Sequence, residues 1–331
     1  MKQPARANKL DIGREPKYQM SAEGCSFFMD SVFKNSEMKD EKTRIRKVFC
    51  DIVNVILPII QKYRHEIQNL EVKHKKNHTL LTEADIAVQK AVVEIIWDHD
   101  PACQIIAEED IKPGILDSNS TDQYTWIVDP IDGTREFISS KGKEFCTAVC
   151  LMFERMPIGA MVLLPELGHK SRPLLIEATS HPSQIFLNGT PIAIPPTSEK
   201  DIPKKISATR SHGRKPYLFE SQLAAFGCTL KTRTTSQTID LLRVATDLSA
   251  FTEPPMDSFD LFYREKQKLW DGAPGIFLNY IAGRVVVNEN GQSIIPFSED
   301  ILDQSTPVLP ITVVGPPKYV NWFLALCSKT H

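Results

Sequence analysis

Six short apolar runs between residues 104 and 187 constrain the fold of this chain more than any other feature. Each run has the length and composition of a β-strand, and turn-forming segments follow most of them. An Asn188-Gly189 pair, which favours a tight hairpin, closes the last run. Because strands joined by tight turns pair in opposite directions, we expect a mostly antiparallel sheet. The runs are Gln104–Ala107, Tyr124–Val128, Phe145–Phe153, Ile158–Leu164, Leu174–Ala178 and Gln184–Leu187.

Helical patterns precede these runs. Apolar residues recur at three- and four-residue steps from Ile45 to Tyr63, which predicts a core-facing helix that Pro58 bends. A polar stretch, Lys73–Thr79, then leads to Thr82-Glu-Ala-Asp85, whose spacing is typical of a capping box with Asp in place of Glu. We therefore expect a second helix to begin at Thr82 and to run through Trp97.

The pattern changes after Pro195 and Pro196, where the composition is that of a loop. Beyond this point strands alternate with helical segments, which predicts an α/β unit. The expected strands of this unit are Ile206–Thr209, Cys228–Lys231, Ser249–Thr252, Val285–Val287 and Ile311–Val314.

The length of 331 residues is sufficient for two hydrophobic cores. We expect an N-terminal arm over residues 1–38, with residues 1–24 mobile, and a first domain over residues 39–200 that holds the antiparallel sheet. A smaller α/β domain over residues 201–331 would complete a cleft between the two.

Charge and composition exclude several classes of protein. The chain has 39 Lys and Arg against 41 Asp and Glu, so no large basic field draws a nucleic-acid polymer or an anionic membrane to it. No run approaches the roughly 20 apolar residues of a membrane span, and no secretory signal is apparent. The seven cysteines are an odd number without a C-x-x-C pair, which favours reduced thiols and a cytoplasmic location.

Acidic residues gather at the ends of the expected strands and helices. Asp129-Pro-Ile-Asp-Gly-Thr134 follows Tyr124–Val128 directly, so a turn there can direct both carboxylates into one cleft. Asp-Pro and Asp-Gly are also common turn dipeptides, Glu108-Glu-Asp110 could be a solvated loop, and Asp271 could be a helix N-cap. Each feature alone has a structural explanation, whereas their combination in this order does not.

The combination resembles the magnesium-dependent, lithium-sensitive phosphatases of the inositol monophosphatase superfamily. The resemblance runs from about residue 40 to the C-terminus and implies an α/β (α+β/α sandwich) fold, the sugar-phosphatase-like layered αβαβα architecture. The continuation Arg135-Glu-Phe-Ile138 is more similar to the 3'(2'),5'-bisphosphate nucleotidase branch than to the inositol branch. The motifs are Thr82-Glu-Ala-Asp85, Glu108-Glu-Asp110, Trp126-Ile-Val-Asp-Pro-Ile-Asp-Gly-Thr134, and Trp270-Asp271 with Ala273 and Gly275.

The resemblance implies a set of metal ligands in the first and second domains. Glu108, Asp129 and the main-chain carbonyl of Ile131 would hold one ion, and Asp129, Asp132 and Asp271 a second. An oxygen-only ligand set suits Mg²⁺ or Mn²⁺ rather than Zn²⁺. Two such ions about 3.5–4 Å apart can activate water and relieve the charge on a phosphoryl group. We expect two or three ions and inhibition by Li⁺.

The same resemblance implies catalytic and substrate-binding residues. Asp85 and Thr134 would act as a pair, in which the carboxylate polarises the hydroxyl so that it orients and deprotonates the attacking water. The backbone N–H groups of Gly133 and Thr134 would receive a phosphate oxygen. Lys75 keeps the spacing of a family lysine, and Ser211 and His212 lie in a Ser-Arg-Ser-His-like stretch, so these three residues are expected to bind substrate.

One departure concerns the expected nucleotide contact. The bisphosphate branch commonly carries Gly-Ser-Ser-x-Lys in the second domain, whereas Ser236-Gln-Thr-Ile-Asp240 stands here and reverses the charge at Asp240.

The sequence therefore predicts a Mg²⁺-dependent phosphomonoester hydrolase that removes the 3'-phosphate from 3'-phosphoadenosine 5'-phosphate or a similar small bisphosphate. The first alternative is an inositol monophosphate or sugar bisphosphate phosphatase. The second is a catalytically silent homologue that binds a metabolite. We expect a small-molecule phosphate partner, and the resemblance allows a homodimer.

Overall fold

The structure is a computed structural model that describes residues 35–69, 74–109, 124–181, 183–196, 202–211 and 213–328. The expected mobile arm at residues 1–24, Asp110 and His212 lie outside these residues, and so do the side chains of Lys75 and Thr82.

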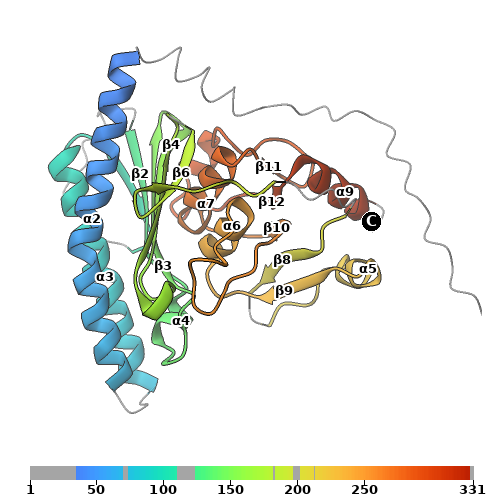
Figure 1. Cartoon of the computed structure of the whole chain (residues 1–331), viewed down its shortest axis with the longest axis horizontal. Helices are drawn as coiled ribbons and strands as arrows, with labels where there is room; N and C mark the ends of the chain where they lie inside the picture. The colour runs from blue at the N-terminus through green and yellow to red at the C-terminus, as the bar shows by residue number, and fades with distance from the viewer. Residues whose placement is uncertain are drawn as a thin grey trace, which may run out of the picture.

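The elements form alternating layers of helices and sheets (Figure 1). A long helix pair, α2 (Asn35–Asn69) and α3 (His74–His99), covers one face of the first sheet. The pair α6 (Gln237–Ala245) and α7 (Leu269–Ile281) lies between the first and second sheets. Two short helices, α5 (Glu220–Ala225) and α9 (Pro317–Cys327), pack on the far face of the second sheet. This order confirms the expected layered αβαβα fold.

The first sheet has seven strands in sequence order. Every neighbouring pair is antiparallel except β1 and β2, which are parallel. The six expected runs are all strands here, and the Asn188-Gly189 turn adds a seventh. The strands are β1 (Gln104–Ala107), β2 (Tyr124–Asp132), β3 (Cys146–Phe153), β4 (Met156–Leu164), β5 (Leu174–Thr179), β6 (Gln184–Leu187) and β7 (Thr190–Pro191).

The second sheet is mixed and has the order β11-β12-β10-β8-β9. Strands β10, β8 and β9 run parallel, so their carboxyl ends meet at one edge, whereas β12 is antiparallel to both of its neighbours. The strands are β8 (Lys205–Arg210), β9 (Thr229–Arg233), β10 (Leu261–Arg264), β11 (Val285–Val287) and β12 (Thr312–Gly315).

Two expectations for the second sheet were wrong. Ser249–Thr252 is not a strand, and Thr252 forms an isolated bridge with Gly168 instead. The central strand β10 was missed because all four of its residues are buried, and a short buried run shows no alternation of apolar and polar residues.

The start of α3 also differs from the expectation. The helix begins at His74 rather than at Thr82, so the polar stretch Lys73–Thr79 is mostly helical. This stretch contains no glycine or proline, and its lysines are good helix formers. The remaining short helices are α4 (Thr134–Ile138), α8 (Glu299–Leu302) and a 3₁₀ turn at His169–Ser171.

Strand β3 shows how the first sheet separates two cores. Cys146 and Cys150 face the α6–α7 layer, whereas Val149 and Leu151 face the α2–α3 layer, as the alternation of side chains along a strand requires. Since both faces are covered, all eight residues of β3 are buried, and all except Thr147 are apolar. Within the described residues, no helix has the length and apolar character needed to cross a membrane.

Candidate active site

A bulge in β2 brings its two aspartates to the same side of the sheet. Asp129 pairs with Ala148 and Asp132 pairs with Cys146, so β2 carries one residue more than β3 over this interval. In a regular strand, residues three apart point to opposite faces, and one extra residue reverses that relationship. The hydroxyl of Thr147 donates a 2.7 Å hydrogen bond to the carbonyl of Pro130 inside the bulge.

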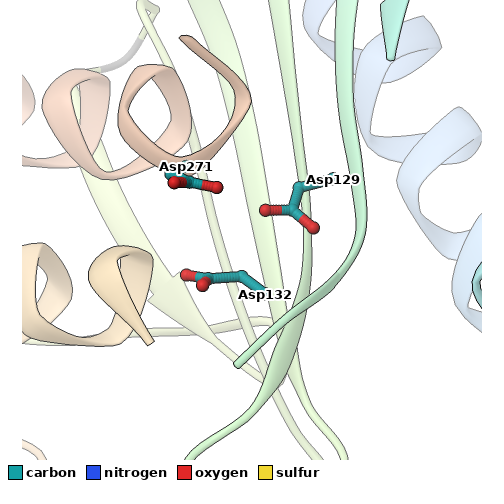
Figure 2. A group of neighbouring side chains, drawn as sticks. All are labelled: Asp129, Asp132 and Asp271. Atoms are coloured by element: carbon teal, nitrogen blue, oxygen red, sulfur yellow. The ribbon is translucent and has the colours of Figure 1, made fainter. Parts of the chain in front are cut away.

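The third aspartate comes from helix α7. Figure 2 shows the carboxylates of Asp129 and Asp132 on β2 and of Asp271 on α7 pointing toward one another. One carboxylate oxygen from each lies within 4.8 Å of the other two. Asp271 is not the N-cap that the sequence indicated, because α7 begins at Leu269 and its N-cap is Lys268. Its carboxylate nevertheless lies in the first helical turn, where the helix dipole favours a negative charge.

Gly275 allows α7 to approach α6 closely. A Cβ atom at Gly275 would lie 2.5 Å from the Cβ of Leu241. A side chain at this position would push the two helices apart, and with them Asp271 and the first turn of α6.

Donors in the first turn of α6 form hydrogen bonds with two of the three carboxylates, those of Asp132 and Asp271. The hydroxyl of Ser236 and the backbone N–H of Thr238 donate to Oδ2 of Asp132, at 2.7 and 2.8 Å. The side-chain amide of Gln237 donates to Asp271 Oδ2. Our reading of the sequence missed these contacts. Ser236 immediately before a helical run is an N-cap signal that locates the turn but does not reveal its partners.

Asp129 has no such donors. It is fully buried, and neither of its carboxylate oxygens has a hydrogen-bond partner in the described structure. Burial, together with the nearby charges of Glu108, Asp132 and Asp271, raises its pKa well above the ordinary value. Burial and the charges of Asp132 and Glu108 likewise raise the pKa of Asp271. A buried carboxylate without donors is unfavourable unless a cation or a proton neutralises it.

Glu108 and Asp85 add two further acids next to the cluster. Glu108 follows β1, which runs beside β2, and its backbone N–H donates to the carbonyl of Val128. Burial and the charge of Asp132 raise the pKa of Glu108 to about 7. Burial, with Glu108 and Glu109 nearby, raises the pKa of Asp85 to about 8.

Gln89 fixes the segment that carries Glu108 against α3. Its side-chain amide donates to the carbonyl of Glu109 at 2.7 Å and accepts from the Glu109 N–H at 2.9 Å. Asp85 lies one helical turn before Gln89, so this pair of hydrogen bonds holds the Glu108 segment beside the Asp85 carboxylate.

The acids border a cavity of about 580 Å³ between the two sheets. Eight of the residues singled out from the sequence line it, whereas Asp85 is buried and does not. The hydroxyl of Thr134 donates to the carbonyl of Ile131 at 3.5 Å, and no hydrogen bond joins Thr134 to Asp85 in the described part of the chain. The eight lining residues are Glu108, Asp129, Ile131, Asp132, Gly133, Thr134, Ser211 and Asp271.

The backbone conformation at position 133 favours glycine. Its φ is +93°, in the left-handed region, and a Cβ there would lie 2.6 Å from the carbonyl oxygen of Glu144. The residue therefore permits the sharp turn between β2 and α4 that brings Thr134 to the cavity.

The Asp240 carboxylate, which stands where the nucleotidase branch commonly carries a lysine, is not among the groups that line the cavity. Asp240 is fully buried and accepts from the Lys231 ammonium at 2.6 Å and from the Ser207 hydroxyl at 2.8 Å. Lys231 also donates to Glu144 at 2.9 Å. This network joins β9, α6 and the segment before β3, and thereby braces the turn that contains Ser236.

The donor set fits a hard divalent cation. Asp129, Asp132 and Asp271 supply only oxygen atoms, they converge within bonding distance of a shared ion, and Asp129 has unpartnered oxygens. Asp132 Oδ2 is already occupied by protein donors, which leaves its other oxygen for a ligand.

Comparisons with known proteins identify a family. The model of the inositol monophosphatase family matches residues 41–313. An inositol monophosphatase of Dictyostelium discoideum is 28% identical over 243 residues, which are 73% of this chain and 83% of that protein. The 3'(2'),5'-bisphosphate nucleotidase CysQ of Aggregatibacter actinomycetemcomitans is 30% identical over 101 residues, which are 30% of this chain and 37% of that protein.

A solved structure shares the fold. The extragenic suppressor protein suhB from Bartonella henselae superposes with a TM-score of 0.63 at 19% identity, over 86% of this chain and 98% of that chain.

The fold and the site first define a class: a layered α+β protein with a carboxylate cluster at the edge of a polar cavity is suited to metal-dependent phosphate chemistry. The match over residues 41–313 then identifies the family. The chain belongs to the inositol monophosphatase family and is a metal-dependent phosphatase, as its motifs predicted.

Proposed function

We propose that this phosphatase removes the 3'-phosphate from 3'-phosphoadenosine 5'-phosphate or from a similar small bisphosphate. The supporting observation is the lining of the cavity, which combines four carboxylates with five arginines. A substrate with a second anionic group complements this lining, because the arginines can bind an anion that the metal ligands do not hold. The Arg135-Glu136-Phe137 sequence after the Asp-Gly-Thr turn, typical of the nucleotidase branch, points the same way.

The metal site would be formed by the acids described above. Glu108, Asp129, Asp132, Asp271 and the carbonyl of Ile131 would hold Mg²⁺. When bound, Mg²⁺ supplies Lewis-acid activation of water and neutralises the charge that develops on the phosphoryl oxygens.

The protein's own groups would orient the reaction. The N–H groups of Gly133 and Thr134 would donate to a phosphate oxygen and fix the phosphorus atom for in-line attack. The oxygen of water bonds to phosphorus while the ester bond to the leaving oxygen breaks. A proton of this water would pass through the Thr134 hydroxyl to Asp85, which must be ionised to accept it. The pKa of Asp85 is about 8 in the metal-free protein, so bound cations near Glu108 would have to lower this pKa for Asp85 to act as the proton acceptor near neutral pH. The leaving oxygen takes a proton from solvent.

Two alternatives have different support. Of the phosphatase alternatives, inositol monophosphate rather than a sugar bisphosphate is favoured by the Dictyostelium inositol monophosphatase, which aligns over a much larger part of the chain than the nucleotidase does. A silent metabolite-binding homologue is disfavoured because the six acids and hydroxyls of the site are all retained. They are Asp85, Glu108, Asp129, Asp132, Thr134 and Asp271.

Phosphate release tests the proposal. The purified protein with Mg²⁺ would be assayed on 3'-phosphoadenosine 5'-phosphate, inositol 1-phosphate and fructose 1,6-bisphosphate, with Asp271→Asn as the inactive control. We expect the nucleotide to have the highest kcat/KM. Turnover of inositol phosphate alone would reject the substrate, and no turnover of any phosphate ester would favour the silent homologue.

We also propose several further features of this protein. They are the division at residues 39–200 and 201–331, a cytoplasmic location, a homodimer, two or three bound ions with Mn²⁺ as a substitute, inhibition by Li⁺, and substrate contacts by Lys75, Ser211 and His212.

A further inference from the structure

Arg64 is a buried side chain outside the cavity that no step of the proposed reaction uses. It lies near the end of α2, which packs beside α4 (Figure 1), and it is 3% exposed. It does not line the cavity. All five N–H groups of its guanidinium nevertheless donate to acceptors of the protein, which are three backbone carbonyls and one carboxylate.

The three carbonyls belong to one short segment, Phe137–Gly142. Nη1 donates to the carbonyl of Phe137 and, at 2.8 Å, to that of Ser139, and Nη2 donates to the carbonyl of Gly142. Nε and Nη2 donate to the two carboxylate oxygens of Glu166, at 3.0 and 3.3 Å. Lysine has a single nitrogen and cannot reproduce a planar set of five donors. The hold on this segment therefore depends on the geometry of arginine as well as on its charge.

Two aromatic rings complete the surroundings of Arg64. The guanidinium carbon lies 6.0 Å from the ring centroid of Phe137 and 5.3 Å from that of Phe145. The two rings are buried and pack edge to face, with their centroids 5.2 Å apart. Cation–π contacts add to the hydrogen bonds, so Arg64 joins α2 to both ends of the connection between α4 and β3.

The segment that Arg64 holds fixes the peptide group between Gly133 and Thr134. The backbone N–H groups of Glu136 and Phe137 donate to the carbonyl of Gly133, at 2.8 and 3.0 Å. That carbonyl and the N–H of Thr134 belong to the same planar peptide group. Hydrogen bonds to the carbonyl therefore also fix the direction of the Thr134 N–H, which is one of the two groups proposed to receive a phosphate oxygen.

The other end of the segment returns to the same turn. Gly142 leads directly to Glu144 and Phe145, and a Cβ atom at Gly133 would lie 2.6 Å from the carbonyl oxygen of Glu144 and 3.0 Å from the Cα of Phe145. The turn at Gly133 is therefore packed against residues on both sides of the segment whose carbonyls Arg64 binds.

We propose that Arg64 is a positioning residue for phosphate binding, which holds the Gly133–Thr134 peptide in the orientation that receives a phosphate oxygen. This inference rests on the proposed function, because it concerns the groups assigned there to the cleaved phosphate. The neighbouring ligand Asp132 is held separately, by Ser236 and Thr238. Loss of Arg64 should therefore weaken phosphate binding more than metal binding.

A binding measurement tests the proposal without requiring hydrolysis. The protein would be titrated calorimetrically with Mg²⁺ alone, and with inorganic phosphate at saturating Mg²⁺. We expect Arg64→Lys to bind phosphate about tenfold more weakly than the wild type, because one hydrogen bond to a charged group is misaligned, and to bind Mg²⁺ within about twofold of the wild type. Equal phosphate affinity, or equal losses of phosphate and Mg²⁺ affinity, would overturn the inference.

Arg46 supplies a matched control on the same helix. It donates to Glu177 at 2.9 Å and lies 4.6 Å from the ring centroid of Phe186, so it also combines a carboxylate with an aromatic ring. It does not line the cavity. Arg46→Gln should keep the phosphate affinity of the wild type, and a tenfold loss in this variant would show that the effect of Arg64→Lys is not specific to the turn.

Kinetics on several substrates test which part of the substrate is affected. The turn is proposed to contact the cleaved phosphate, which all phosphate esters share. Arg64→Lys should therefore lower kcat/KM by a similar factor, about tenfold, for every ester that the wild type hydrolyses. A loss confined to one ester would overturn the inference, because it would place the effect on another part of the substrate.

A second variant keeps the test decisive if Arg64→Lys does not fold. Glu166→Met retains Arg64 and its three carbonyl acceptors but removes the carboxylate that holds Nε, at a side chain that is 22% exposed. It should bind phosphate about threefold more weakly, and wild-type phosphate affinity in this variant would then overturn the inference. If the wild type hydrolyses no phosphate ester, the proposed function fails, and the phosphate titration still decides the role of Arg64.

Discussion

The hydroxyl of Ser236 donates a 2.7 Å hydrogen bond to Oδ2 of Asp132, across 104 residues of sequence. Asp132 belongs to the strand that carries the central acids, and Ser236 belongs to the helix layer between the two sheets. The proposed metal site is therefore oriented by both halves of the chain, and the stability of the turn at Ser236 affects the direction in which Asp132 points.

Replacement of Ser236 by alanine should weaken metal binding. A hydrogen bond to a charged group contributes about 1.5–3 kcal/mol, and its loss leaves Asp132 Oδ2 with one strong donor. We expect Ser236→Ala to raise the Mg²⁺ concentration for half-maximal activity about tenfold, with a smaller loss at saturating Mg²⁺. Ser328→Ala, which removes only an exposed hydrogen bond to Ala325, is the control. An unchanged Mg²⁺ dependence would show that Ser236 is only a helix cap.

Replacement of Asp129 by asparagine should separate activity from stability. The unpartnered, fully buried carboxylate is unfavourable in the absence of metal, so a neutral amide of similar volume relieves the repulsion. We expect Asp129→Asn to abolish phosphate release and to leave the melting temperature in EDTA unchanged or higher. Asp300→Asn, at an exposed position in α8, controls for the change in net charge. Wild-type turnover by Asp129→Asn would contradict the assigned role.

The metal-free protein should become less stable as the pH rises. Asp85 has a pKa of about 8 and Glu108 of about 7, both above their values in the unfolded chain, so the folded state binds more protons. The corresponding stability is present at low pH and is lost as the pH rises from about 4 toward 8. In EDTA, the melting temperature should fall by at least about 5 °C between pH 5.5 and pH 8.

Two comparisons make the pH prediction specific. Saturating Mg²⁺ should flatten the dependence, because the ions stabilise the ionised carboxylates. Glu108→Gln in EDTA should reduce the slope, because one of the titrating groups is removed. A wild-type melting temperature that rises with pH over this range would contradict the electrostatics of the site.

Lys231 should be essential to the packing between β9 and α6. It neutralises Asp240, which is fully buried, and Glu144. Its loss would leave Asp240 with only the more distant Arg243, at 3.9 Å, so Lys231→Met should destabilise the fold by about 3–5 kcal/mol in urea denaturation. Adding Asp240→Asn should restore part of this loss. Additive effects of the two substitutions would show that the pair is not coupled.

Local sequence patterns predicted most of the first sheet and the family, for physical reasons. Runs such as Gln104–Ala107 are bounded by turn residues, and Asp129-Pro-Ile-Asp-Gly-Thr134 carries its chemistry within six consecutive residues. The site ligands are close to strand and helix ends, so a linear motif was sufficient to propose them.

Features that depend on the tertiary structure were not predictable in this way. The bulge that aligns Asp129 with Asp132 depends on pairing with β3, and the donors on Asp132 come from a helix more than a hundred residues away. Strand β10 was missed because all four of its residues are buried, and burial on both faces leaves no alternation for a sequence pattern to reveal.

The central claim is that carboxylates from β2 and α7 share divalent ions. A crystal soaked in Mn²⁺ and measured at the manganese absorption edge tests it directly. We predict an anomalous peak within bonding distance of Asp129, Asp132 and Asp271, and a second peak beside Glu108. Absence of any peak among these three aspartates, at a Mn²⁺ concentration that supports phosphate release, would contradict the account.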